Sequence, residues 1–292
     1  MNILGLYLTS ILIWGSTWLA IIYQLGTVPP TVSVVYRFAL AGLLLLAWVV
    51  IRGLRLRFSL AEHAWMALQG LTLFGINYVC VYIAEVEITS ALVAVVFSLV
   101  VFLNIAGARI FFDTPLKPVM LIGAVLGVAG LVLVFLPQFE TGVGKGDTVL
   151  GLTLALFGAF SASMGNLLAS RNHRHGLPVV QMNTFGMLYG ALFVAVYALA
   201  SGQQFVFDWS QRYLLSLGYL AVFGSIIAFG AFLALLGRIG ADRAGYVGVA
   251  IPIVALLLSA LFEGMQWHLS LGIGILLCLC GNVAVMRAKR AT

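Results

Sequence analysis

Charged residues are scarce in this chain. Only 8% of its 292 residues are Asp, Glu, Lys or Arg, whereas 63% are hydrophobic, and the mean hydropathy is +1.13. So small a polar fraction cannot cover the surface of a soluble globule of this length. The composition therefore excludes a soluble domain and predicts an integral membrane protein, whose solvent is the lipid bilayer.

Reactive and metal-binding groups are also few. The three cysteines lie inside apolar runs, and the four histidines lie in loops or at the end of a span, so we expect no disulfide framework, metal site or cofactor. A Gly-x-x-x-x-Gly-Lys-Ser/Thr loop is missing, which excludes ATP hydrolysis by this chain. A Gly-x-Ser-x-Gly elbow is missing too, and no histidine lies within a span, which argues against an intramembrane enzyme.

Long apolar segments fill the rest of the sequence. A membrane-spanning helix needs ~20 mostly apolar residues, and prolines and charged clusters divide the chain into ten such segments. We predict an all-α protein with membrane-spanning helices at residues 3–23, 31–51, 65–84, 89–110, 118–137, 147–169, 178–201, 213–236, 244–263 and 269–287.

The basic residues of the loops predict the orientation. Of the Lys and Arg residues in the loops and at the ends of the spans, twelve fall on one side of the membrane and two, Lys145 and Arg212, on the other. Basic loops stay in the cytoplasm. We therefore expect both termini to be cytoplasmic in a multi-pass inner (plasma) membrane protein, and the placement accounts for the net charge of +6 without a nucleic-acid partner. The twelve are Arg52, Arg55, Arg57, Arg109, Lys117, Arg171, Arg174, Arg238, Arg243, Arg287, Lys289 and Arg290.

Glycine spacing indicates that the chain is a duplication. Laying residues 118–137 over 269–287 pairs Gly123 with Gly274 and Gly130 with Gly281. Five spans per half force the second half to enter the membrane from the opposite side, and inverted repeats are typical of alternating-access transporters. We expect one five-helix repeat in residues 1–140 and an inverted one in residues 145–292.

Polar and aromatic residues inside the spans are candidates for a solute site, because a polar group in hydrocarbon is costly unless it faces a cavity or a partner helix. Tyr78 and Tyr82 are four residues apart, so they share a helix face and could stack on an apolar solute. The alternatives are packing for the aromatic residues, bonds to their own helix for the serines, and interhelical bonds for the asparagines. The candidates are Tyr78, Tyr82, Asn77, Trp14, Trp18, Ser16, Ser163, Asn166 and Ser98, and Asn104 is a further polar residue of span four.

Three other residues are expected to act in gating or structure. Arg37 is the only basic residue inside a span. It either attracts an anionic carboxylate or forms a structural lock with Glu85, Glu87 or Glu263, since a lone buried cation is unfavourable. Pro252 breaks the hydrogen bonding of its helix, so it could act as a hinge, line a cavity or simply kink the helix.

Several motifs resemble the drug/metabolite transporter superfamily, EamA type, and the resemblance covers essentially the whole chain. They are Trp14-Gly15-Ser16-Thr17-Trp18, Pro30 followed by Tyr36-Arg37-Phe38, and Ile251-Pro252 followed by Glu263-Gly264. The first half departs from the pattern, because Ser98-Leu99-Val100 stands where the second half has its proline. That departure leaves open whether span four bends as span nine should.

The resemblance implies an exporter of small organic solutes, and within the superfamily the chain looks most like the amino-acid and aromatic-metabolite exporters. We expect neutral or zwitterionic solutes, most of all amino acids, and a protein that functions as a monomer without enzyme activity. An exporter of cationic drugs is the alternative within the superfamily, since Trp and Tyr faces attract cations. A channel or scaffold subunit is the alternative outside it.

The orientation can be tested with a reporter fused after Thr292. A reporter that is active only in the cytoplasm is expected to be active in this fusion, because the basic loops retain the C-terminus on that side. Activity of a second reporter that works only in the periplasm, fused at the same place, would contradict the assignment.

Overall fold

All regular structure in the part of the chain that the structure describes is helical. The computed structural model describes residues 2–113, 115, 118–141, 146–232, 234–235, 238, 246–264 and 268–290, with the backbone alone at 137–141, 246, 249 and 285–290. The first predicted half contains α1 (Ile3–Ile22), α2 (Pro30–Ile51), α3 (Leu60–Gln69), η1 (Gly70–Ile76), α4 (Asn77–Glu87), α5 (Ser90–Phe97), α6 (Val100–Phe112) and α7 (Pro118–Thr141). The second contains α8 (Thr148–Arg174), α9 (Val179–Ala200), α10 (Gln211–Gly218), η2 (Tyr219–Ile227), α12 (Tyr246–Phe262) and α13 (Leu269–Arg290).

Eight of the helical segments in the described residues are long and apolar enough to cross a membrane. They include α3, η1 and α4 as one continuous segment, Leu60–Glu87, and α5 with α6 as another, Ser90–Phe112. Ala250–Phe262 and Leu269–Ala284 are shorter apolar helices, and they lie within the predicted spans nine and ten. The all-α membrane fold is therefore confirmed for the described residues, with each predicted span containing a helix.

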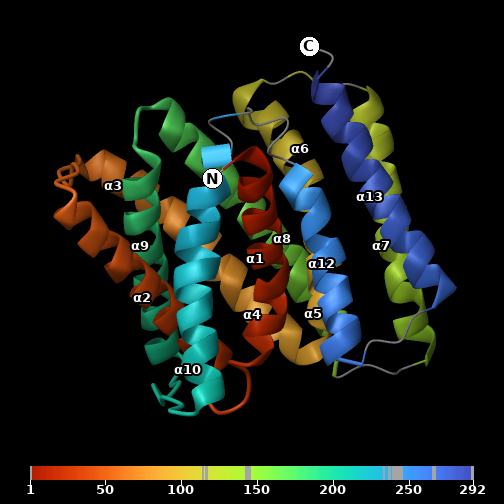
Figure 1. The fold of residues 1–292 in the computed structure, drawn as a ribbon, viewed down its shortest axis with the longest axis horizontal. Coiled ribbons are helices and arrows are strands. Elements are labelled where there is room, and N and C mark those ends of the chain that lie inside the picture. The colour runs from red at the N-terminus through yellow and green to blue at the C-terminus, as the bar shows by residue number, and fades with distance from the viewer. Residues whose placement is uncertain are drawn as a thin grey trace.

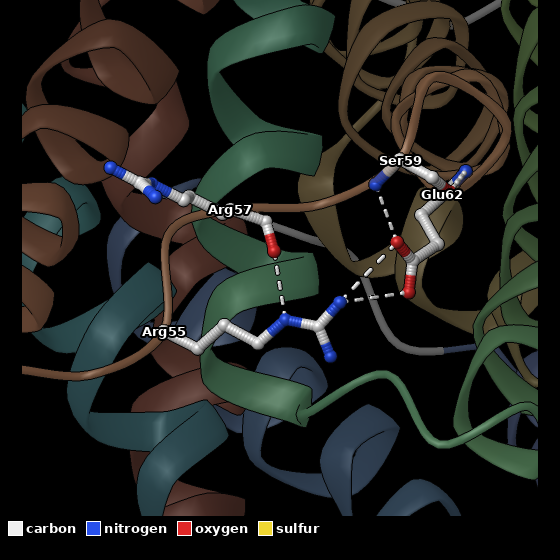
Figure 2. Close-up of polar contacts among 4 residues, drawn as sticks. All are labelled: Arg55, Arg57, Ser59 and Glu62. Atoms are coloured by element: carbon white, nitrogen blue, oxygen red, sulfur yellow. Dashed lines mark hydrogen bonds and ion pairs between the residues drawn. The ribbon is translucent and has the colours of Figure 1, made fainter.

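Side-chain hydrogen bonds in the loop before α3 fix the start of that helix. The Ser59 hydroxyl accepts the Glu62 backbone N–H at 3.2 Å, and the Glu62 carboxylate accepts the Ser59 N–H at 2.6 Å, which completes a capping box. Arg55 donates to the same carboxylate at 3.3 Å and to the Arg57 carbonyl at 2.8 Å (Figure 2). These contacts fix the turn between α2 and the segment that carries η1 and α4.

Two π-helical segments lie at matching places in the two halves of the chain. In η1 the Thr72 carbonyl accepts a hydrogen bond from Ser161 of α8 at 2.8 Å, and in η2 the Gly224 carbonyl accepts one from Trp14 of α1 at 3.1 Å. Short π-helical segments inside α-helices are rare and occur frequently at functional sites. The first helix of each half thus donates to the π-helical segment of the other half.

The contacts between helices are reciprocal across the two halves. Helix α2 packs on α9, and α7 packs on α13. The other contacts are equivalent when the two halves are exchanged. Helix α8 contacts η1, and α1 contacts η2; likewise α9 contacts η1, and α2 contacts η2. Helix α1 contacts α12, and the equivalent α8 contacts α5 and α6. The core is therefore built from helices of both halves, and α1, α8 and α12 lie in the middle of the bundle (Figure 1).

Helices α7 and α13 lie side by side at one edge of the bundle (Figure 1), and glycines bring their backbones together. A Cβ atom on Gly274 would lie 2.5 Å from the Gly130 carbonyl oxygen, and one on Gly281 would lie 2.5 Å from that of Gly123. The four glycines that align the two halves in the sequence thus face each other in space. Such small-residue contacts are a usual means of close helix packing in lipid.

The start of α1 and the end of α13 lie at the same end of the bundle (Figure 1). Which side of a membrane that end faces stays a prediction from the loop charges. Of the basic residues used for it, Lys117, Lys145 and Arg243 lie outside the described residues, as do residues 142–145 at the proposed junction of the halves.

A pair of alanine substitutions on α13 tests the α7–α13 contact. Gly274→Ala should lower the thermal midpoint of the purified protein, because the new methyl group overlaps the Gly130 carbonyl oxygen and such overpacking costs about 1–3 kcal/mol. Gly272 has nothing within 4 Å of its Cβ position, so Gly272→Ala should leave the midpoint unchanged or raise it slightly. Equal midpoints for the two variants would show that the contact is not close.

Candidate functional site

A cavity of about 370 Å³ lies between helices of both halves. Its walls come from α1, α4, α5, α6, α8 and α12 and from the segment that follows η2. The volume is in the ~300–1,000 Å³ range of small-molecule sites. The lining residues are Trp14, Thr17, Trp18, Ile21, Asn77, Tyr78, Val81, Ala94, Phe97, Ser98, Val100, Val101, Asn104, Ala162, Asn166, Phe229, Phe232, Gly248, Ile251 and Pro252.

Aromatic rings form much of the cavity wall and hold one another in place. The Trp18 and Phe97 rings pack edge to face with centroids 5.0 Å apart. The Trp14 ring packs in the same way on Phe229 at 5.0 Å and is tilted against Phe232 at 5.2 Å. Because the Trp14 indole N–H donates to the Gly224 carbonyl, its ring orientation is fixed and its apolar surface stays available to a solute.

The polar groups of the lining are uncharged. Asn77, from the first turn of α4, donates its amide to the Leu73 carbonyl at 3.0 Å, and its side-chain oxygen is buried without a hydrogen-bond partner. The Asn104 side-chain oxygen and the Ser98 hydroxyl are also buried and lack a partner, whereas Asn166 is exposed. The lining, as far as the structure describes it, contains no charged side chain.

The structure brings six of the nine predicted binding residues together in this cavity. They are Trp14, Trp18, Asn77, Tyr78, Ser98 and Asn166. Their convergence from α1, α4, α8 and the α5–α6 junction could not be read from spacing along the chain, because they lie in four different predicted spans.

The other three predicted residues lie outside the lining. The Tyr82 hydroxyl donates to the Gln24 side-chain oxygen at 2.6 Å, and the Tyr82 ring is fully buried. The Ser16 hydroxyl lies 2.6 Å from that of Tyr219 and also donates to its own helix. Ser163 is fully buried behind the wall. Tyr78 and Tyr82 therefore do not meet one solute surface in this conformation, although they are only one turn apart.

Several lining residues are not recognisable as such from the sequence. Phe97, Phe229 and Phe232 supply half of the aromatic residues of the cavity wall. The chain contains 19 phenylalanines, most of them in apolar segments, so no sequence feature separates these three from packing residues. Among these residues, Asn104 alone is marked in the sequence as a site candidate, because it is an amide within an apolar span.

Arg37 lies behind the cavity wall. Its side chain is 1% exposed, its guanidinium carbon is 4.6 Å from the centroid of the Tyr78 ring, and its Nε donates to the Ser225 hydroxyl at 3.4 Å. Glu85 is 2% exposed, and both Arg37 and Glu85 interact electrostatically with Tyr82. Arg37 and Glu85 thus belong to one buried cluster, which also contains Gln24 through its bond to Tyr82.

The two other carboxylates considered as partners of Arg37 make different contacts. Glu87 accepts the Asp147 backbone N–H at 2.7 Å. Glu263 accepts hydrogen bonds from the Ser90 hydroxyl and, at 3.2 Å, from the Ser90 N–H. Each carboxylate therefore joins two helix ends.

Irregular backbone occurs on two facing sides of the cavity. Pro252 lies inside α12 and lines the cavity. In the other half, α5 ends at Phe97 and α6 begins at Val100, and the N–H groups of Ser98 and Leu99 bond to carbonyls three residues earlier. Span four is therefore interrupted without a proline, which answers the question that the sequence left open.

The comparison with known families agrees with this architecture. The sequence profile of the EamA-like transporter family matches residues 1–136 and 149–287. The chain belongs to the EamA-like transporter family. It is therefore a membrane transporter, and the family implies a small-molecule substrate and a lipid bilayer as its surroundings.

Relatives of this EamA-like transporter are found in Escherichia coli (strain K12). One of them is YedA, named an uncharacterised inner membrane transporter. The two sequences are 30% identical over 269 residues, which cover 90% of this chain and 84% of YedA. Another is a protein named a probable amino-acid metabolite efflux pump. It is 24% identical to this chain over 304 residues, which cover 98% of this chain and 96% of the relative. A protein of known crystal structure superimposes with a TM-score of 0.71 and 21% identity over 98% of this chain and 96% of the other, which shows a shared fold.

Two substitutions on α4 distinguish a cavity residue from a packing residue in this EamA-like transporter. Tyr78→Ala should weaken solute binding about fivefold, because a lost ring contact costs ~1 kcal/mol. Tyr82→Phe removes the hydroxyl that bonds to Gln24 and interacts with Arg37 but keeps the ring, so it should lower the thermal midpoint and leave the dissociation constant unchanged. Both quantities can be measured on purified protein, and a weaker affinity in Tyr82→Phe alone would place the solute next to Tyr82 instead.

Proposed function

We propose that the protein exports small neutral or zwitterionic organic solutes, most of all amino acids and related metabolites, by alternating access. The observation that carries the proposal is the cavity described above, with aromatic walls and uncharged amides, at the junction of helices from both halves. Solutes with an apolar body and a small polar end match such a lining. One chain supplies all the described walls, which supports function as a monomer.

Ten spans in two inverted repeats are part of this proposal. Its support is the set of reciprocal helix contacts, the paired π-helical segments η1 and η2, and the match of one family profile to two consecutive stretches. Inverted repeats allow two conformations that exchange the roles of the halves around a central site. The interruptions at Ser98–Leu99 and Pro252 would allow these helices to bend in such an exchange.

The choice of amino acids has two supports. One relative is named a probable amino-acid metabolite efflux pump. In addition, the described lining has no cluster of cations, so it would bind nucleotide sugars and other polyanions poorly. The alternative substrate class is cationic drugs, which the six aromatic rings would favour through cation–π contacts.

Arg37 and Glu85 are proposed to act in gating and not in solute contact, and Pro252, which also lines the cavity, is proposed to act as a hinge. Arg37 and Glu85 are buried beneath the wall in the cluster with Tyr82 and Gln24. A buried charged cluster that joins α2, α4 and the loop after α1 can hold one end of the pathway closed, since separating its members would expose uncompensated charge.

Counterflow in proteoliposomes tests the transport mechanism. Vesicles loaded with unlabelled phenylalanine should accumulate labelled phenylalanine transiently, because a carrier exchanges one bound solute for another. Vesicles with the Tyr78→Ala protein should do so more slowly. Equilibration without transient accumulation would identify a channel and contradict alternating access.

We expect transport without a proton gradient. No Asp, Glu or His lies in the described cavity lining, so a proton carrier would have to be a carboxylate outside it, such as Glu85. Downhill phenylalanine transport should therefore proceed at equal pH on both sides, and Glu85→Gln, which preserves side-chain volume, should slow it only modestly. Uphill accumulation that requires a pH gradient and is abolished in Glu85→Gln would instead make the protein a proton antiporter.

A further inference from the structure

We propose that the cavity recognises its solute through the amino group and not through the carboxylate, so that primary amines without a carboxylate are also substrates. This inference rests on the proposed function, because it concerns the same cavity. It adds which half of an amino acid the protein binds, and it extends the substrate class to aromatic monoamines.

Asn77 supplies the first hydrogen-bond acceptor. A carbonyl oxygen can only accept, so the contact between the Asn77 amide and the Leu73 carbonyl fixes which end of the side chain is the NH₂ group. The Asn77 oxygen is then the atom left without a partner, in a residue that is 4% exposed and lines the cavity. A buried acceptor without a donor is unfavourable, and an ammonium group of a solute would supply the donor.

Asn104 supplies the second acceptor, from a different helix of the cavity wall. Its side-chain oxygen is also buried without a partner, and Asn104 lies on α6 whereas Asn77 lies on α4. The two oxygens therefore belong to different walls of one cavity. An ammonium group has three N–H donors, so either oxygen offers it an acceptor and a second donor remains for the other.

A carboxylate finds no comparable partner. No Lys, Arg or His is part of the described lining. Arg37 is 1% exposed beneath the Tyr78 ring, and Glu85, which is 2% exposed, belongs to the same buried cluster. Arg37 is therefore not an isolated positive charge beside the cavity wall. A solute carboxylate could reach the Arg37 guanidinium only by displacing the Tyr78 ring.

The aromatic walls favour the same end of the solute. The faces of Trp14, Trp18 and Tyr78 carry negative electrostatic potential, which attracts an ammonium group and repels a carboxylate. Amide oxygens and ring faces therefore act in the same direction. The carboxylate of a bound amino acid is expected to remain in the most hydrated part of the cavity, near exposed Asn166.

Three compounds that differ by one group test the inference. Displacement of labelled phenylalanine from the purified protein is measured with unlabelled phenylalanine, 2-phenylethylamine, which lacks the carboxylate, and 3-phenylpropanoate, which lacks the amino group. We expect 2-phenylethylamine to compete within about threefold of phenylalanine and 3-phenylpropanoate to be at least about tenfold weaker, as for the loss of a charged hydrogen bond.

A pair of asparagine substitutions supplies the matched control. Asn77→Leu should reduce the affinity for 2-phenylethylamine about tenfold and leave that for 3-phenylpropanoate nearly unchanged. Asn282 is likewise fully buried with both side-chain polar atoms lacking a partner, but it lies on α13 outside the cavity lining. Asn282→Leu should therefore leave both affinities unchanged, and Asn104→Leu provides a second test if Asn77→Leu does not fold.

The outcomes separate this inference from the proposed function. If phenylalanine binds and 3-phenylpropanoate competes as well as 2-phenylethylamine does, the amino-group assignment is overturned and the export of amino acids stands. If 2-phenylethylamine binds tenfold more weakly than phenylalanine, the carboxylate is required and the inference is likewise overturned. If none of the three compounds binds, the proposed amino-acid substrate fails together with the inference.

Discussion

The requirement that every backbone polar group be satisfied away from water governs this structure. In hydrocarbon an unpaired N–H or C=O group costs several kcal/mol, so lipid-facing segments must be helical. In the described spans, four departures from regular α-helix contact another helix or the cavity. The carbonyls of η1 and η2 accept Ser161 and Trp14, while the Ser98–Leu99 interruption and Pro252 line the cavity.

Close packing of backbones is the second consequence of a lipid solvent. Apolar side chains gain little by leaving lipid for another helix, so helices associate through shape and small residues. Gly130 and Gly274 bring α7 against α13, and Gly70 lies against the Gly186 carbonyl where η1 meets α9. Each contact joins one half of the chain to the other, so the halves form a common core.

The low dielectric constant of the membrane interior also explains where the charged residues lie. Arg37 and Glu85 are both buried near Tyr82 and outside the cavity lining, so the described lining is left without a charged side chain. The proposed site, formed by rings and amide oxygens, would release its solute without breaking an ion pair to the described lining. That property suits a transporter better than a tight receptor, because turnover requires dissociation.

The sequence alone determined the class, the helices and most of the polar candidates, because hydropathy and helix length depend on consecutive residues. Composition predicted the membrane protein, each predicted span contains a helix, and the Trp14–Trp18 motif pointed to the EamA-like family. Tertiary structure decided which candidates share a cavity. Tyr78 and Tyr82 differ by one turn, yet Tyr78 lines the cavity and Tyr82 bonds to Gln24. Phe97, Phe229 and Asn104 meet there only because helices distant in sequence pack together, and no local pattern encodes that packing.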